Sequence, residues 1–369
     1  MKDPRVDKLA DLLVNYSLGV QPRQRVMIQG DFGGEPLMSA VMSKCLQVGA
    51  YPFFVPYGPQ HFEDIFRYAA PDTFADLLEP YKNIVKTFDA RLFIYGELNT
   101  KFASQFNPET VSKYYAQAGE ISNVMLDRSA KGEMNWVVSL FPTYAYAQEA
   151  NMTLTDYEDF VYSACMPDLD DPVGYWKKVE ARQNKAIEWL KGKKNAHITA
   201  PGTDLTLSIE GRPFINCACQ VNVPDGEIFT SPIENSANGY VHFTYPTLYQ
   251  GFEVDDVRLE FKDGKVVKAT AGKNEDYLLM KLDTDEGARY LGEFAIGTNE
   301  GINRFTGKIL FDEKIGGSFH IALGKSYAES KGKNKSAIHW DMICDLRNGG
   351  EITIDGELFY KDGAFVIDF

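Results

Sequence analysis

Two histidines with acidic neighbours are the residues of this sequence best suited to chemistry. In the segment AIHWDMI, His339 and Asp341 are two residues apart, so in a strand both side chains point to the same face. A carboxylate in an otherwise apolar strand is unfavourable unless a partner compensates its charge. A divalent cation is a natural partner, because imidazole nitrogen and carboxylate oxygen are its usual ligands. On this spacing alone, a hydrogen-bonded structural pair and a proton-transfer dyad remain open as alternatives.

Three further segments place carboxylates in similar surroundings. Glu227 follows a turn and leads into an apolar pair in NVPDGEIFT, and Glu293 lies inside the strand-like run GEFAIGTN. In LFDEKIGGSFHIALG, a glycine turn joins the acidic pair that ends in Glu313 to His320. Glu227 taken singly has the pattern of a solvated turn residue. The joint pattern instead indicates acids gathered around two of only five histidines.

The segments PDGEIFTSP, GEFAIGTN, LFDEKIGGSFHIALGKSY and AIHWDMI, in that order, resemble the metal-dependent aminopeptidases typified by aminopeptidase T and aminopeptidase S of bacteria. The N-terminal half is similar to that family only in its α/β pattern. The resemblance implies two adjacent divalent ions. Ligation by oxygen and nitrogen suits Zn, Co or Mn, with Mg as a further candidate. The resemblance also puts Tyr327 where the family has its catalytic tyrosine. The implied metal ligands are Glu227, Glu293, Glu313, His320, His339 and Asp341.

One spacing departs from the family pattern. The segment between the acidic pair and His320 is longer here than in the family, which bears on whether Glu313 is a ligand. Charge balance favours the complete set, because four converging carboxylates repel one another unless cations or protons compensate them. Two dications would balance the four carboxylates, and neutral imidazoles would add no charge.

The chemistry that the resemblance implies is hydrolysis of the first peptide bond of a peptide with a free N-terminus. Metal ions would activate a water molecule, and Glu293, or Glu313 in second place, would take its proton. Tyr327 would donate a hydrogen bond to the oxyanion. The family's dimers imply a homodimer whose site opens to an internal cavity. A metal-dependent amidase or phosphoesterase, and a non-catalytic binding protein, are the competing hypotheses.

Other catalytic motifs are absent from the sequence. No H-E-x-x-H or G-x-S-x-G occurs, and QGDFGG lacks the residue order of both common phosphate-binding loops. Cys217 and Cys219 could ligate a soft metal, but in INCACQVNV we interpret them as buried apolar side chains along a strand. His242 lies among aromatic residues and is interpreted as packed rather than ligating.

Composition narrows the class of protein. The 369 residues include 52 Asp and Glu against 38 Lys and Arg, a net charge of −14, which disfavours nucleic-acid and anionic-membrane partners. The 24 Phe and 20 Tyr supply more apolar area than disordered chains carry. Five scattered cysteines fit reduced thiols better than a disulfide framework. Without a signal-like or membrane-spanning apolar run, a cytoplasmic location is expected.

The first half of the chain alternates between apolar runs and helical patterns. This alternation predicts a parallel sheet with helices on its faces, in an N-terminal α/β domain of residues 1–190. The expected helices cover residues 3–18, 35–48 and 172–194. The expected strands include the apolar runs at residues 25–29, 51–57, 91–95, 124–126 and 136–142.

The second half changes to period-two alternation interrupted by Asp-Gly pairs. KDGK at residues 262–265 and IDGE at residues 354–357 are strong hairpin signals, and one helix is expected near residues 274–287. The sequence therefore predicts a mostly antiparallel, β-rich domain of residues 191–369. This domain contains every candidate site residue.

Overall fold

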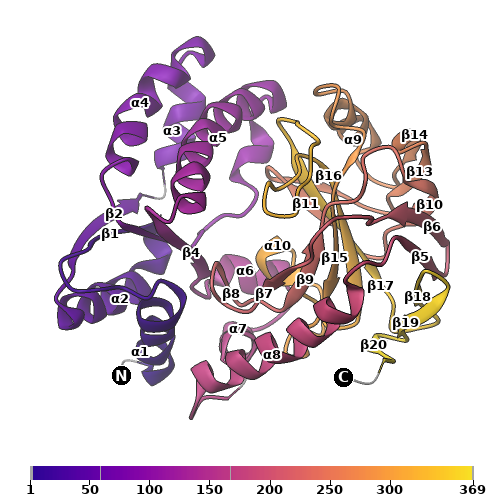
Figure 1. The fold of residues 1–369 in the computed structure, drawn as a ribbon. Helices are drawn as coiled ribbons and strands as arrows, with labels where there is room; N and C mark the ends of the chain where they lie inside the picture. Colours follow the sequence, from indigo (N-terminus) through magenta and orange to yellow (C-terminus); the bar gives the residue numbers. More distant parts are fainter. Residues whose placement is uncertain (1–2, 59, 167, 368–369) are drawn as a thin grey trace. The chain divides into compact units, whose positions relative to one another are not determined.

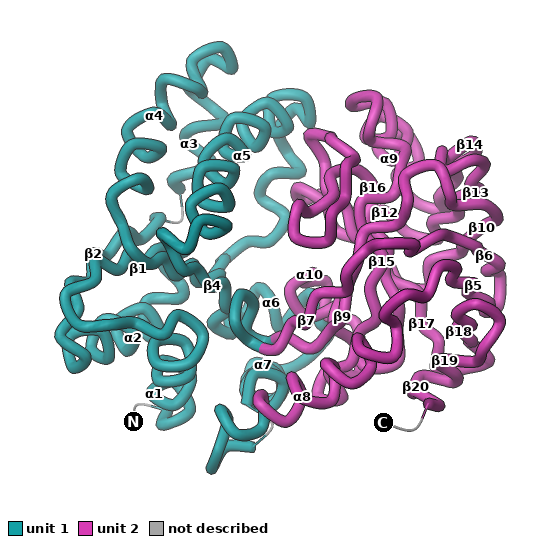
Figure 2. The backbone as a smooth tube through the Cα atoms, viewed as in Figure 1, with its two compact units in different colours: residues 1–175, 219–224 teal, residues 176–218, 225–369 magenta. Residues whose placement is uncertain are grey.

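The protein is described by a computed structural model with two compact units (Figure 2). The described residues are 3–58, 60–166 and 168–367. Unit 1 comprises Met1–Tyr175 and Cys219–Pro224, and unit 2 comprises Trp176–Ala218 and Asp225–Phe369. Within the described residues, no helix has both the length and the apolar character needed to cross a membrane.

A five-stranded sheet in the order β2-β1-β3-β4-β8 forms the centre of unit 1 (Figure 1). All of its neighbouring strands are parallel. The fold class predicted from the alternating pattern is thereby confirmed. The strands are β1 (Arg25–Asp31), β2 (Tyr51–Tyr57), β3 (Ala90–Tyr95), β4 (Asn135–Leu140) and β8 (Asn222–Val223).

Helices cover both faces of this sheet (Figure 1). Helix α2 packs against β1 and β2, whereas α4 and α5 contribute Val85, Ile121 and Met125 to a core cluster with Met27 of β1. The helices are α1 (Pro4–Asp11), η1 (Leu12–Ser17), η2 (Phe32–Gly34), α2 (Glu35–Val48), α3 (His61–Tyr68), η3 (Pro71–Thr73), α4 (Phe74–Val85), η4 (Phe102–Gln105), α5 (Pro108–Ala130), α6 (Tyr144–Glu149) and α7 (Leu154–Cys165).

The predicted strand at residues 124–126 is wrong, because these residues lie inside α5. Ile121 and Met125 are both buried, and their spacing of four residues places them on one helical face. An apolar run of three residues is too short to show either the helical or the strand period.

Unit 2 is built mainly from antiparallel sheets, as predicted. An eight-stranded sheet has the order β14-β13-β10-β6-β5-β18-β19-β20, and a five-stranded sheet, called sheet C below, has the order β17-β16-β15-β9-β7. The strands are β5 (Asn195–Ala200), β6 (Thr203–Ser208), β7 (Ile215–Cys217), β9 (Glu227–Thr230), β10 (Asn238–His242), β11 (Thr247–Tyr249), β12 (Phe252–Val254), β13 (Arg258–Lys262), β14 (Lys265–Thr270), β15 (Leu291–Gly297), β16 (Ser318–Gly324), β17 (His339–Asp345), β18 (Glu351–Ile354), β19 (Glu357–Lys361) and β20 (Ala364–Phe365).

Both predicted Asp-Gly hairpins are present. Asp263 and Gly264 connect β13 to β14 with φ angles of 49° and 84°, and Asp355 and Gly356 connect β18 to β19 with φ angles of 51° and 82°. Two successive residues with positive φ match the right-handed twist of the flanking strands. The helices of unit 2 are α8 (Pro172–Leu190), α9 (Glu275–Leu282) and α10 (Ile309–Asp312).

One face of sheet C forms the core of unit 2. Phe294, Phe319, Ile321 and Met342 belong to a buried cluster that also contains residues of the eight-stranded sheet, such as Leu205. Burial of each such side chain stabilises the fold by about 1.5–3 kcal/mol. The apolar alternation of β15, β16 and β17 therefore determines which face of sheet C points inward, and the other face remains for polar side chains.

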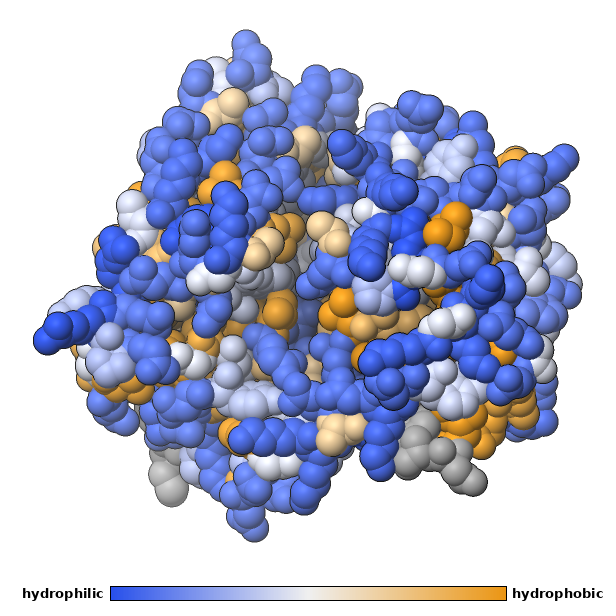
Figure 3. All heavy atoms as spheres, viewed as in Figure 1, coloured by the Kyte–Doolittle hydropathy of each residue, from blue (hydrophilic) through white to orange (hydrophobic). Residues whose placement is uncertain are grey.

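The face of the molecule drawn in Figure 3 is exposed to solvent and polar in character, with scattered hydrophobic residues. Against this background, several carboxylates of unit 2 are buried, among them Asp225, Glu227, Glu293 and Asp312. Buried carboxylates need hydrogen bonds or cations to compensate their charge. The residues around them are therefore candidates for a metal-binding or catalytic site.

Candidate metal centre

Five of the six predicted ligands project from the same face of sheet C. Residues directly opposite each other on antiparallel strands share a face, as do residues two apart on one strand. Glu227 of β9 lies opposite Gly297, Ala295 lies opposite His320 of β16, and Ala322 lies opposite Asp341 of β17.

The strand register also determines the direction of the other two ligand candidates on the sheet. Glu293 is two residues from Ala295 on β15, and His339 is two residues from Asp341 on β17, so both join the same face. Gly297, Ala295, Ala322 and Gly324, which are small, lie directly opposite these side chains or between them on β15 and β16. Their small size leaves the carboxylates and imidazoles room to converge.

Gly324 ends β16 and pairs with His339. Its φ is +98°, and a Cβ atom built there would lie 2.3 Å from the carbonyl oxygen of Ile338. A side chain at this position would therefore push β17 away from β16. Glycine here keeps His339 in register with the rest of the site.

The structure brings all six predicted ligands together. Three overlapping groups form, and within each group one potential ligand atom per residue lies within 4.8 Å of the others. Glu313 belongs to one of these groups although it follows α10 rather than lying on the sheet. The longer segment between Glu313 and His320 therefore leaves the Glu313 side chain close to the other five. The groups are Glu227, Glu293 and His320; Glu293, His339 and Asp341; and Glu313, His320 and Asp341.

Glu293 connects the two histidines. Its Oε1 lies 3.4 Å from Nε2 of His320, and its Oε2 lies 3.4 Å from Nε2 of His339. The same two nitrogens also face the outer carboxylates, at 3.4 Å from Glu227 Oε2 and 3.6 Å from Asp341 Oδ1. Each imidazole therefore lies between two carboxylates.

The donor atoms fit divalent metal ions. Nδ1 of His339 lies 2.8 Å from the carbonyl oxygen of Lys325 and donates to it, so Nε2, which faces the carboxylates, is the nitrogen that can bind a metal ion once it has lost its proton. Glu227 Oε2 is buried and accepts no hydrogen bond within the described residues. A buried carboxylate oxygen without a donor is unfavourable, and a site of imidazole nitrogen and carboxylate oxygen suits Zn, Co or Mn.

Without metal, both histidines carry positive charge, in addition to the ammonium group of Lys314. Burial opposes protonation of both imidazoles. The hydrogen bond and charge of Glu293, with the charge of Glu227, nevertheless raise the pKa of His320 to about 9, and the charge of Asp341, followed by Glu293, raises that of His339 to about 10. Burial alone would raise the pKa of Glu293, yet its bonds to both histidines bring that pKa down to about 2. Burial dominates at Asp341, raising its pKa to about 6, and it also raises the pKa of Glu313.

Tyr327 lies beside this cluster. Its ring centroid is 4.9 Å from that of His339 and 5.7 Å from that of Phe229, which shares the polar face of sheet C. Burial, and then the negative charge of Glu293, raise the pKa of the Tyr327 hydroxyl well above its ordinary value. The hydroxyl therefore stays protonated at neutral pH and can donate a hydrogen bond.

Sequence reasoning missed Lys314. Its side chain is completely buried, with Nζ 3.0 Å from Glu227 Oε1 and 4.0 Å from Asp225 Oδ1, and it donates a hydrogen bond to Oε1 of Glu313. A lysine directly after an acidic pair usually forms an exposed ion pair, so its position in DEKIGG carries no signal of burial. Only the three-dimensional packing reveals it.

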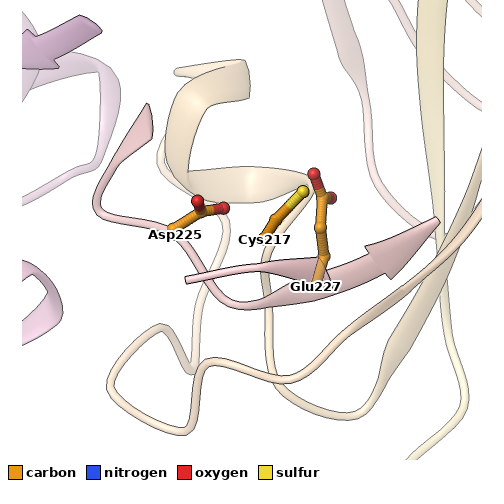
Figure 4. A group of neighbouring side chains, drawn as sticks. All are labelled: Cys217, Asp225 and Glu227. Carbon is orange, nitrogen blue, oxygen red and sulfur yellow. The ribbon is translucent and has the colours of Figure 1, made fainter. Parts of the chain in front are cut away.

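Cys217 lies at the edge of the site, but Cys217 and Cys219 do not lie on one strand as predicted. Strand β7 ends at Cys217, whereas Cys219 lies beyond it with φ of 67°. The sulfur of Cys217 lies within 4.8 Å of carboxylate oxygens of Asp225 and Glu227 (Figure 4). The buried amide of Gln183, from α8, donates to the carbonyl oxygens of Cys217 and Glu227 and thereby holds β7 and β9 in place.

Four carboxylates and two imidazoles, buried or half-buried, that converge over one sheet face are typical of metal-dependent hydrolases. Comparison with known proteins agrees with this class. The chain belongs to the thermophilic metalloprotease family (M29), whose family model matches residues 2–365. The resemblance inferred from the four motifs is thereby confirmed.

Relatives match nearly the whole chain. Aminopeptidase 2 of Geobacillus stearothermophilus is 27% identical over 98% of this chain and 95% of its own length. Aminopeptidase T of Thermus thermophilus is 26% identical over 97% of this chain and 95% of its own length. The solved structure of wild-type AmpT from Thermus thermophilus superimposes with a TM-score of 0.86 at 23% identity, covering 99% of both chains.

The fold by itself does not define the reaction. A 2,5-dihydroxypyridine dioxygenase from Pseudomonas putida KT2440 shares it with a TM-score of 0.58 at 14% identity, covering 98% of this chain and 97% of its own. The family assignment and the site residues must therefore carry the functional argument.

Proposed function

We propose that this protein is a metal-dependent aminopeptidase that releases N-terminal residues from peptides. The observation that carries the proposal is the convergence of six nitrogen- and oxygen-bearing side chains in three overlapping groups, five of them from one face of sheet C and Glu313 from the end of α10. Membership of the metalloprotease family supports it, as do the names of the aminopeptidase relatives.

Two divalent ions, Zn, Co or Mn in preference to Mg, would be held by the side chains that converge here. When bound, such ions polarise a carbonyl oxygen and lower the pKa of a water molecule toward 7. Four carboxylates around two imidazoles balance two dications in charge. The residues that would hold them are Glu227, Glu293, Glu313, His320, His339 and Asp341.

Glu293 is the proposed proton carrier. It is ionised at neutral pH, because its bonds to the two histidines outweigh burial and bring its pKa to about 2. An ionised carboxylate at the centre of the site can accept a proton from the attacking water and pass it to the leaving amine. Glu313 is the second candidate, since burial raises its pKa and favours its holding a proton.

Tyr327 is the proposed oxyanion donor. Its hydroxyl stays protonated, and its ring packs against His339 and Phe229 at the edge of the cluster. A positioned donor of this kind contributes about 2.7–4 kcal/mol to transition-state stabilisation. This contribution would be absent from a site that only binds metal for structural reasons.

The substrate would carry a free N-terminal amine, which an acidic site attracts as a cation. We further propose a cytoplasmic homodimer acting on short or unfolded peptides, with neither nucleic acid nor membrane as partner. The excess of acidic residues over basic residues supports the last point.

The test compares a set of aminoacyl-p-nitroanilides with their N-acetylated counterparts, using protein stripped of metal and then reloaded with Zn, Co or Mn. Release from the free-amine substrates only, dependent on added metal, is the expected result. Cleavage of a phosphoester or a simple amide without any cleavage of aminoacyl substrates would favour a different hydrolase. Well under one metal per chain after reloading would overturn the proposal.

A further inference from the structure

We infer that Lys314 is a positioning residue of the proposed metal centre. Its ammonium group binds one oxygen of Glu227 and one oxygen of Glu313, and this orients the second oxygen of each carboxylate toward the metal ions. The inference rests on the proposed metal-dependent function. It assigns a role to a residue that lies inside one of the motifs but is not among the ligands or catalytic residues expected from the sequence.

The geometry of the ammonium group is the first argument. The Lys314 side chain has no exposed surface, and Nζ lies 3.0 Å from Glu227 Oε1 while donating a hydrogen bond to Glu313 Oε1. One cation thus contacts two members of the candidate ligand set at once. A buried charge with two carboxylate partners has a fixed orientation, unlike an exposed lysine.

The opposite oxygen of Glu227 is the second argument. Oε1 is occupied by Lys314, whereas Oε2 lies 3.4 Å from Nε2 of His320 and accepts no hydrogen bond within the described residues. Lys314 therefore fixes the Glu227 carboxylate through Oε1, and Oε2 remains able to bind a metal ion. This is the arrangement expected of a ligand oriented by an outer partner.

Charge is the third argument, and it concerns the neighbouring group of Cys217, Asp225 and Glu227. Their potential ligand atoms lie within 4.8 Å of one another (Figure 4). Lys314 Nζ lies 3.0 Å from Glu227 and 4.0 Å from Asp225, so an internal cation already compensates these carboxylates. Asp225 and Lys314 cancel in charge, and the four carboxylates of the ligand set still balance two dications.

The test is the affinity for metal, measured apart from activity. Wild-type protein and a Lys314→Met variant are stripped of metal, checked for folding by circular dichroism, and titrated with Zn in competition with a chromophoric chelator. We expect binding to weaken roughly 10- to 100-fold in the variant, the range seen when outer-shell partners of ligands are removed. The absorption spectrum of the Co-loaded variant should change as well, because the ligand geometry changes.

Whether metal affinity falls, stays the same or rises in Lys314→Met distinguishes a positioning role from a purely electrostatic or purely structural one. Loss of a positive charge alone would tighten cation binding, and loss of a purely structural contact would lower the melting temperature without altering affinity. Unchanged or tighter metal binding in a folded Lys314→Met variant would therefore overturn the inference. If that variant does not fold, Lys314→Gln is measured instead, with weaker binding expected and the same outcomes overturning the inference.

Lys281→Met is the matched control, since Lys281 is also a buried lysine of unit 2. Its Nζ lies 2.7 Å from Gln250 Oε1 and over the rings of Tyr249 and Tyr277. Its removal should leave metal affinity unchanged, and an equal loss would contradict a specific role for Lys314. Failure of the wild-type protein itself to bind metal would instead refute the proposed function, so the two failures are distinguishable.

Discussion

Nε2 of His320 lies 3.4 Å from Oε2 of Glu227, the oxygen of that carboxylate which accepts no hydrogen bond within the described residues. Glu227 is the first residue of β9 and His320 lies within β16, and β15 separates the two strands in sheet C. Because Ala295 and Gly297 of the intervening strand are small, the two side chains meet above it. This pair shows how the site depends on sheet register.

Replacing Glu227 by glutamine should remove a charged ligand while preserving its shape. We expect the Glu227→Gln variant to bind metal at least tenfold more weakly, as judged by chelator competition, and to remain folded. Glu260→Gln, on an exposed position of β13, is the control and should bind metal as the wild type does. Wild-type affinity in Glu227→Gln would exclude this residue from the ligand set.

Replacing Glu293 should affect catalysis more than any other single carboxylate change. Loss of a positioned proton carrier lowers the rate about 10²- to 10⁴-fold, and Glu293 also connects the two histidines. The measurement is kcat/KM on an aminoacyl-p-nitroanilide, together with metal content per chain. A Glu293→Gln variant with full metal content and full activity would leave Glu313 as the candidate, which Glu313→Gln would then test.

Removing the hydroxyl of Tyr327 should slow catalysis without weakening the binding of substrate or metal. We expect Tyr327→Phe to lower kcat about 10²- to 10³-fold, the loss that follows removal of one oxyanion donor, with little change in KM. Metal content should not change, because the ring still packs against His339. Tyr240→Phe, at an exposed tyrosine of the same unit, provides the control. Unaltered kcat in Tyr327→Phe would show that the hydroxyl does not contact the reacting carbonyl.

The sequence leads to the side chains that converge here, but not to every contact among them. Strand periodicity alone puts His339 and Asp341 on one face, and the order of the motifs leads to Glu293 and His320, because both signals depend on local spacing. The burial of Lys314 could not be predicted, since nothing in DEKIGG distinguishes a buried ammonium from an exposed one. The helix at residues 124–126 was missed for a similar reason. The apolar run is too short to distinguish a helix from a strand, and packing within α5 determines that these residues are helical.

The short strand β8 shows the same limitation at the level of topology. Asn222 and Val223 pair with β4 in the parallel sheet of unit 1, although the chain before Cys219, back to Trp176, and the chain after Pro224 belong to unit 2. Two residues carry no detectable period, so no pattern in the sequence predicts this return.

Metal affinity should increase with pH. In the metal-free protein, partnership with the carboxylates outweighs burial and raises the pKa of His320 to about 9 and of His339 to about 10, so both are protonated at pH 7. A metal ion must displace these protons before the imidazoles can bind it. Chelator competition at pH 6, 7 and 8 should therefore give progressively lower dissociation constants. Affinity independent of pH over this range would contradict the assignment of the two histidines as ligands.

The stability of the metal-free protein should change with pH in the opposite direction. Both histidines have a pKa that is higher in the folded protein than the ordinary value of about 6.5. Their contribution to the free energy of unfolding is therefore complete below about pH 6.5 and is lost as the pH rises through about 9 to 10. Urea unfolding of the stripped protein should show decreasing stability from pH 7 to pH 10. Saturating metal should remove most of this decrease, since it binds only the folded, deprotonated site. A decrease of equal size in the presence of metal would mean that other groups cause it.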